Sequence, residues 1–217
     1  MGQFEPRRWV IFTRSVISTV GNPDAHLFRA LAAALARRGL DAVCVEERAN
    51  PAVVALLQQQ GARGVDAFRA DHPALHYRTV PPRSGLELVE WLGGALATAD
   101  VALVQHDAPA DLVLAVGSLT RTHLQTYLID SGLGAPLAPG ELAARRPAAY
   151  SAVLIGRVDA ADAYRELVPP ARLHHFGPLP SSDADEPPPS LREAAEGLVE
   201  VIARLARRGD RSVPADR

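Results

Sequence analysis

The stretch WVIFTRSVISTVGNPDAHLFRALAAALARRGLDAVCVEER, residues 9–48, contains one complete strand, loop and helix followed by a second strand. Residues 9–14 form a short apolar run, and residues 15–24 form a loop that carries glycine, asparagine and proline. Apolar side chains then recur at helical spacing in residues 25–38, and residues 40–45 form another apolar run. A helix that connects two short apolar strands is typical of a βαβ unit with parallel strands.

The same alternation continues to residue 176. The further strands expected are residues 75–80, 101–104, 124–129, 152–155 and 173–176. The further helices expected are residues 51–60, 85–99, 109–118, 139–146 and 159–167. Residues 62–76 show no regular period and are expected to be irregular. We therefore predict one α/β domain, residues 1–176, with a doubly wound, mostly parallel, Rossmann-like sheet.

The C-terminal part of the chain has a different composition. Residues 177–190 are rich in proline, serine and acidic residues, which predicts an extended linker. Residues 191–208 carry aliphatic side chains at helical spacing, so we expect an amphipathic helix that docks on the domain. Residues 209–217 are expected to be a disordered tail.

The composition argues against several classes of partner. The 23 basic and 25 acidic side chains nearly balance, which gives no electrostatic footprint for nucleic acid. No apolar run reaches the length of a transmembrane helix or of a signal-peptide core, so we expect a cytoplasmic protein. The single cysteine, Cys44, lies in an apolar run and is expected to be buried there.

Motifs for common cofactors are also missing from the sequence. The loop VGNPD, residues 20–24, matches neither the GxGxxG fingerprint nor the Walker A pattern. No serine lies in a GxSxG elbow, which disfavours an α/β-hydrolase, and the histidines lack the spacing of a zinc site. We therefore expect neither a cofactor nor a metal.

Ligands of open α/β sheets bind at the carboxyl ends of the strands, so polar residues there are the candidates for a site. The candidates for substrate binding are Arg14, Gly21, Asn22, Asp130, Ser131 and Gly132. The candidates for catalysis are His106, Asp107 and Asp130. Residues 46–48 and Arg157 follow two further strands.

Each candidate also has a structural interpretation. Asn22 and Asp24 form either a turn with a helix N-cap, or a site where an amide and free helix N–H groups meet a substrate oxygen. His106 and Asp107 are either a general base with its carboxylate, or an exposed loop residue and the cap of the next helix. Asp130 either binds sugar hydroxyls or holds the following loop.

Three segments together resemble a known family. They are VISTVGNPDAHLFRALAAALARRGLDAVCVEER (residues 16–48), DVALVQHDAP (residues 100–109) and LIDSGLGAPLAPGELAARRPAAYSAVLIG (residues 128–156). They are similar to the N-terminal domain of bacterial GT-B glycosyltransferases of the family 1 and family 4 kind, in the spore-maturation-type subgroup. The resemblance covers about residues 9–176 and implies an acceptor-binding side. It would be lined by Asn22, His106 and Asp130.

GT-B enzymes bind the sugar nucleotide chiefly in a second Rossmann-like domain, and residues 177–190 stand where that domain would begin. The resemblance therefore implies a glycosyltransferase-like half that binds a sugar-containing acceptor or a partner and is inactive alone. Such a half would act with a separate donor-domain protein or as a homodimer, or would be a degenerate relic. The alternative is a stand-alone small Rossmann-like enzyme that acts on a sugar or nucleotide at the strand ends. A deep, closed pocket with a buried charged pair would favour the alternative.

Overall fold

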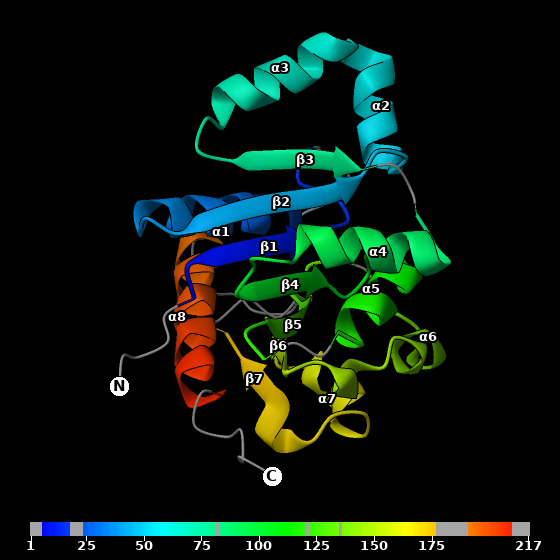
Figure 1. Cartoon of the computed structure of the whole chain (residues 1–217), viewed down its shortest axis with the longest axis vertical. Coiled ribbons are helices and arrows are strands. Elements are labelled where there is room, and N and C mark those ends of the chain that lie inside the picture. Colours follow the sequence, from blue (N-terminus) through cyan, green and yellow to red (C-terminus); the bar gives the residue numbers. More distant parts are fainter. Residues whose placement is uncertain are drawn as a thin grey trace.

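The computed structural model describes residues 6–17, 24–80, 83–119, 122–134, 136–176 and 191–209. Within them the chain forms one sheet of seven strands, all parallel, in the order β3-β2-β1-β4-β5-β6-β7 (Figure 1). The strands are β1 Arg8–Phe12, β2 Asp41–Glu47, β3 His76–Val80, β4 Val101–Gln105, β5 Gln125–Asp130, β6 Ala152–Ile155 and β7 Leu173–His175. The predicted doubly wound α/β fold is confirmed.

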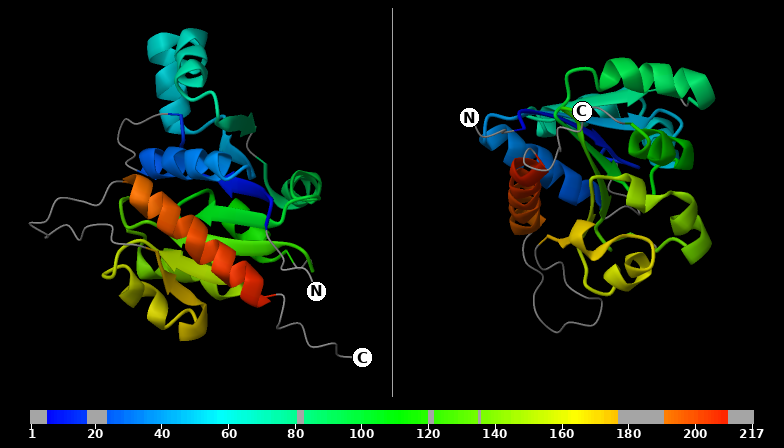
Figure 2. Two further views of the ribbon diagram at one scale, coloured as in Figure 1. Left: turned by 90° about the vertical axis from the view of Figure 1, so that its left-hand side faces the viewer. Right: turned by 60° about the horizontal axis from the view of Figure 1, so that its bottom comes forward.

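Helices cover both faces of the sheet (Figure 2). They are α1 Asp24–Arg37, α2 Pro51–Gln60, α3 Ala62–Asp71, α4 Gly85–Ala95, α5 Ala110–Gly117, α6 Pro139–Ala144, α7 Ala161–Arg165 and α8 Leu191–Gly209. The pleat of β1 explains the two layers, because Trp9 and Ile11 pack in the core under α1 and α8, whereas Val10 and Phe12 pack under α4 and α5. Strands that are buried on both faces have nearly continuous apolar sequences, which is why the short apolar runs predict them.

The C-terminal helix α8 docks on α1, as predicted (Figure 2). Its side chains Leu198 and Ile202 are fully buried in the core that α1 also lines. Ion pairs hold the rim of this contact, because Glu196 accepts hydrogen bonds from Arg37 at 2.6 Å and from Arg38 at 2.8 Å. The amphipathic stripe of α8 therefore completes one layer of the fold.

The irregular segment predicted at residues 62–76 is wrong, because residues Ala62–Asp71 form helix α3. Gly61 adopts a φ of 60° and ends α2, so the chain can turn and begin a second helix at once. Phe68 then anchors α3: its side chain is buried against Val53 of α2, and the guanidinium of Arg29 lies 5.0 Å from its ring centre. Both helices stand beyond β3, at the edge of the sheet (Figure 1).

Other boundaries differ by a few residues. The helix expected at residues 85–99 ends at Ala95. Gly21 and Asn22, and the predicted linker and most of the predicted tail, lie outside the described residues.

Among the described residues, no helix is long and apolar enough to cross a membrane, and no cluster of side chains is suited to hold a metal ion.

Candidate functional site

The strand order places a switch point between β1 and β4. The chain passes from β1 outward to β3, and then returns to β4 on the other side of β1, so the connections after these neighbouring strands run over opposite faces of the sheet. Such a point opens a crevice at the carboxyl ends, where ligands of open α/β sheets bind. Several polar side chains of the described residues are buried near the carboxyl ends of the strands: Thr13, Ser15, Asp24, Gln105, His106, Asp130 and Ser131.

Asp24 connects three strands at their carboxyl ends. It lies in the first turn of α1 and is 2% exposed. Its carboxylate accepts a hydrogen bond from the hydroxyl of Ser131, after β5, and one from the amide of Gln105, the last residue of β4, at 3.2 Å. Gln105 in turn accepts a hydrogen bond from the backbone N–H of Arg14 at 2.9 Å. The ends of β1, β4 and β5 are therefore tied to the start of α1.

Burial raises the pKa of Asp24 from its ordinary value of 3.8 to about 6. The hydrogen bond from Ser131 opposes this shift, while the neighbouring carboxylates of Asp107 and Asp130 add to it and His106 lowers the pKa. The charges of Asp107, Asp130 and His106 therefore all act on the Asp24 carboxyl. The Asp24 carboxyl can therefore gain or lose its proton near neutral pH.

His106 and Asp130 form a buried pair beside this network. The Nδ1 atom of His106 lies 3.7 Å from Oδ1 of Asp130, and the histidine is 2% exposed. Asp130 is fixed, because Oδ2 accepts a hydrogen bond from the hydroxyl of Tyr164 at 3.0 Å and Oδ1 accepts one from the backbone N–H of Gly132 at 2.9 Å. Neither ring nitrogen of His106 has a hydrogen-bond partner among the described residues.

The interpretation of His106 as an exposed loop residue is thus wrong, because the side chain is enclosed next to Asp130. Asp107 also differs from one expectation. The N-cap of α5 is Pro109, without a side-chain cap, whereas Asp107 pairs with Arg14 at 3.1 Å. The other carboxylate oxygen of Asp107 is buried and has no partner in the part of the chain that the structure describes.

The turn after β5 is held in a close contact. Gly132 has a φ of 73°, which disfavours other residues, and an added Cβ would lie 2.6 Å from Arg157. Arg157 donates a hydrogen bond to the Gly132 carbonyl at 3.3 Å and pairs with Asp159. The side chain of Arg157 therefore covers this turn from the end of β6.

Glu46 at the end of β2 has a structural role. Its carboxylate accepts hydrogen bonds from the backbone N–H of Val16 at 2.7 Å and from the hydroxyl of Tyr77, and burial raises its pKa. Arg29 binds the same loop, because it donates to the carbonyls of Val16 and Ile17 at 2.7 Å each. Together Glu46 and Arg29 fix the start of the loop that follows β1.

The structure thus brings most of the predicted site residues together at the carboxyl ends of β1, β4 and β5: Arg14, His106, Asp107, Asp130, Ser131 and Gly132. Gly21 and Asn22 lie outside the described residues. Sequence reasoning missed Gln105 and Tyr164. Gln105 stood at the polar end of an apolar run and could have been found by the same strand-end rule, whereas nothing in the sequence linked Tyr164 to Asp130.

No protein-family model matches the chain, and no curated protein matches it in sequence. Among solved structures, the chain is similar to E. coli tRNA N6-threonylcarbamoyladenosine dehydratase, TcdA, in complex with AMP, at a TM-score of 0.44 and 12% identity. That likeness covers 94% of this chain and 86% of the other. Glucose-6-phosphate 1-dehydrogenase from Mycobacterium avium is similar at a TM-score of 0.37 and 13% identity, over 79% of this chain and 36% of that one. Both likenesses concern the fold alone.

Proposed function

We propose that the chain binds a small hydroxyl-bearing ligand, a sugar or a nucleotide, at the carboxyl ends of β1, β4 and β5, and that His106 accepts a proton from it. The observation that carries this proposal is the buried imidazole, whose ring nitrogens have no partner among the described residues. A buried polar group without a hydrogen bond destabilises a fold by about 1–3 kcal/mol. A ligand hydroxyl at the ring would supply the missing bond.

The neighbours of His106 support a role in proton transfer. Asp130 lies on the Nδ1 side, so Nε2 is the atom left for a ligand, which reaches it only if the side chains that enclose this atom move aside. When Nε2 takes the proton of a ligand hydroxyl, the ring becomes positive, and the Asp130 carboxylate stabilises that charge. Tyr164 and Gly132 hold the carboxylate in place during this step. Asp130 is thus a positioning residue, and His106 is the candidate base.

The other side chains of the edge suit the recognition of hydroxyl groups. The free oxygen of Asp107 can accept a hydrogen bond from a ligand. Arg14, which is largely exposed, can donate to a ligand oxygen by turning away from Asp107. An enzyme that uses its own buried pair at the strand ends is the interpretation that this arrangement favours.

The glycosyltransferase-like half remains a second candidate, and the observation that favours it is the return of α8 onto α1. The resemblance implies such a helix, because the last helix of GT-B chains often crosses back onto the N-terminal domain. In this case the ligand of the same edge would be the sugar-containing acceptor, with the donor bound by a separate protein.

Calorimetric titration of the whole chain with simple sugars, nucleotides and nucleotide sugars tests the proposal. We expect at least one member of this panel to bind, and His106→Ala to weaken that binding by about tenfold or more, because a hydrogen bond to a charged group is lost. His76→Ala is the matched control. His76 also lies beside an aspartate, Asp41, but at the amino end of the edge strand β3. Equal affinity of the His106 variant and the wild type would overturn the proposal.

A further inference from the structure

A groove beside α4 leaves part of the sheet open to solvent. Its floor is made by four valines of β1, β2 and β3, and Trp91 of α4 forms one side: Val10, Val43, Val45 and Val80 are the floor residues. We call this surface the sheet groove. Its volume is about 420 Å³. The groove is thus long and apolar, and it runs across three neighbouring strands.

The topology of the chain explains why this face is open. The chain moves in one direction from β1 to β2 to β3, so right-handed connections put α1, α2 and α3 on the same face of the sheet. Tyr77 of β3 packs there against Phe68 of α3, whereas the next residue, Arg78, lines the groove on the opposite face. Figure 1 shows β2 and β3 open on this second face, and no further described helix lies over them there.

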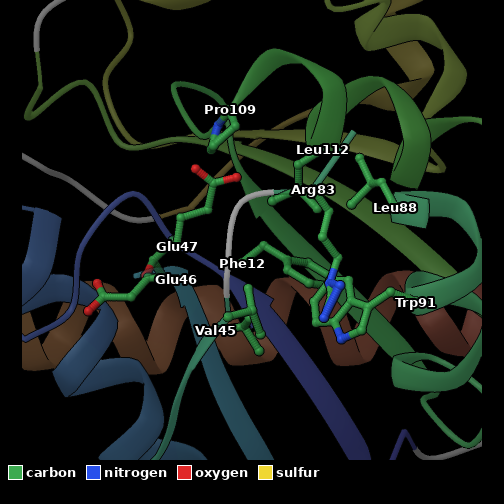
Figure 3. A pocket seen from close by; sticks show the side chains of 11 residues that line it. Phe12, Val45, Glu46, Glu47, Arg83, Leu88, Trp91, Pro109 and Leu112 are labelled. Carbon is green, nitrogen blue, oxygen red and sulfur yellow. The ribbon is translucent and has the colours of Figure 1, made fainter. Parts of the chain in front are cut away.

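The floor and the wall of the groove suit a partner better than water. Val43 and Val80 are only partly buried, and a sheet face that meets only solvent is usually polar. Trp91 is held in place, because Phe12 meets its ring edge-on at 6.2 Å and the guanidinium of Arg83 lies 5.8 Å from its ring centre (Figure 3). A fixed apolar surface of this kind marks an interaction site.

Two charged side chains of the groove lack partners within the chain. Arg78 lies on the β3 side and Glu90 on the α4 side, and both are exposed. Neither forms an ion pair or a hydrogen bond with any of the described residues. A partner that fits the groove therefore offers an apolar side chain to the valines and a carboxylate to Arg78.

The solvent face of α4 offers both groups. Leu86 and Glu90 lie one helical turn apart, on the side of α4 opposite to the buried Leu88 and Leu92. Leu86 is 73% exposed. Gly94 lines the groove, and no atom lies within 4 Å of a Cβ added to it, so a second helix can approach α4 closely. The groove and the helix face that complements it are neighbours on one chain, as a twofold interface requires.

We propose that the chain forms a twofold dimer in which the two α4 helices lie side by side and antiparallel, each over the sheet groove of the other copy. Leu86 of one copy packs on Val43 and Val80 of the second copy, and Glu90 pairs with Arg78 of the second copy. Each contact occurs twice. The groove shares no residue with the His106–Asp130 pair, so the dimer does not depend on the function proposed for that pair.

Sedimentation equilibrium of the whole chain at micromolar concentrations tests the proposal. We expect twice the mass of one chain. Arg78→Glu and Glu90→Arg are each expected to raise the dissociation constant of the dimer by about tenfold or more, because each brings like charges together at both contacts. Leu86→Ser is expected to raise it by about tenfold through the loss of apolar burial. A monomeric wild-type chain would overturn the proposal, as would a dimer that all three variants leave unchanged.

An equimolar mixture of the two charge variants locates the contact. In a mixed dimer, one contact pairs the two introduced charges and the other keeps the native Arg78 and Glu90. We therefore expect the mixture to dimerise again, although each variant alone does so poorly. A pairing within one chain cannot produce this rescue, because each chain carries only one of the changes. A mixture that dimerises no better than its components would refute the proposed interface.

The controls make the same charge changes elsewhere. Arg63→Glu on α3 and Glu166→Arg at the end of α7 alter exposed residues that do not line the groove. Both are expected to leave the dissociation constant of the dimer unchanged, and the melting temperature of every variant reports whether it is folded. Controls that weaken the dimer as much as Arg78→Glu does would show a general effect of charge and contradict the assignment of this surface.

Discussion

The imidazole of His106 and the carboxylate of Asp130 lie 3.7 Å apart at the ends of the neighbouring strands β4 and β5. The parallel pairing of Gln105 with Ile129 places the next residue of each strand side by side, so the register of the sheet creates this pair. Both side chains are buried, and the order of the strands puts them beside the switch point at β1.

Asp24→Asn is expected to stabilise the protein at neutral pH. The pKa of Asp24 is about 6 in the folded state and near 3.8 when the chain is unfolded, so the folded state binds the proton more tightly. The contribution of Asp24 to stability therefore falls as pH rises from about 4 to about 6, by roughly 2–3 kcal/mol, and is level above that. Asparagine does not titrate. Urea unfolding at several pH values measures the difference, and a variant whose advantage does not grow between pH 4 and 6 contradicts this prediction.

Tyr164→Phe is expected to destabilise the fold by about 1–2 kcal/mol, because it removes the hydrogen bond that holds Asp130 and leaves a buried carboxylate oxygen without it. Tyr127→Phe is the matched control. The hydroxyl of Tyr127 is buried and has no partner among the described residues, so its removal should be neutral or stabilising. Thermal unfolding of both variants provides the comparison, and equal melting temperatures would count against the role of Tyr164.

Gly132→Ala is expected to lower stability by about 1–3 kcal/mol. Its φ of 73° strains an alanine, and the new Cβ would collide with Arg157. Gly140→Ala is the control within helix α6, where nothing lies within 4 Å of an added Cβ. That change should stabilise by up to about 1 kcal/mol through the better helix propensity of alanine. Denaturant midpoints that rank the two variants in the opposite order would refute this reasoning.

Deletion of residues 178–217 is expected to lower the melting temperature and the solubility of the chain, because α8 covers the core under α1 with fully buried side chains such as Leu198 and Ile202. Ile202→Ala tests the same contact more gently, with an expected loss of about 2–5 kcal/mol. A shortened chain with unchanged melting temperature and oligomeric state would show that α8 is an accessory tail.

The fold could be predicted because its signals are local. The run at residues 101–104 is apolar at every position, which only a strand buried on both faces requires, and it became β4. Helix α3 was missed because Phe68 is its main buried apolar anchor, which is too little for a periodic pattern. Its position depends on Val53 and Arg29, which belong to other helices.

For the candidate site, the sequence could predict only its location at the carboxyl ends of the strands. The strand-end rule selected His106 and Asp130 without any knowledge of their separation. The bonds that set the chemistry of the edge join distant residues: Asp24 and Ser131 are 107 positions apart, and Tyr164 reaches Asp130 from 34 positions away. Burial of His106 likewise depends on how the helices cover the strand ends, which local patterns do not encode.

The most direct test of the proposed function observes the ring of His106 itself. In a chain with 15N-labelled histidine, the ring nitrogens report protonation and hydrogen bonding as sugars, nucleotides and nucleotide sugars are added. We predict that a binding ligand shifts the His106 ring signals and leaves those of His76, at the amino end of β3, unchanged. A ligand that binds the chain tightly while the His106 signals stay fixed would contradict the assignment of the site.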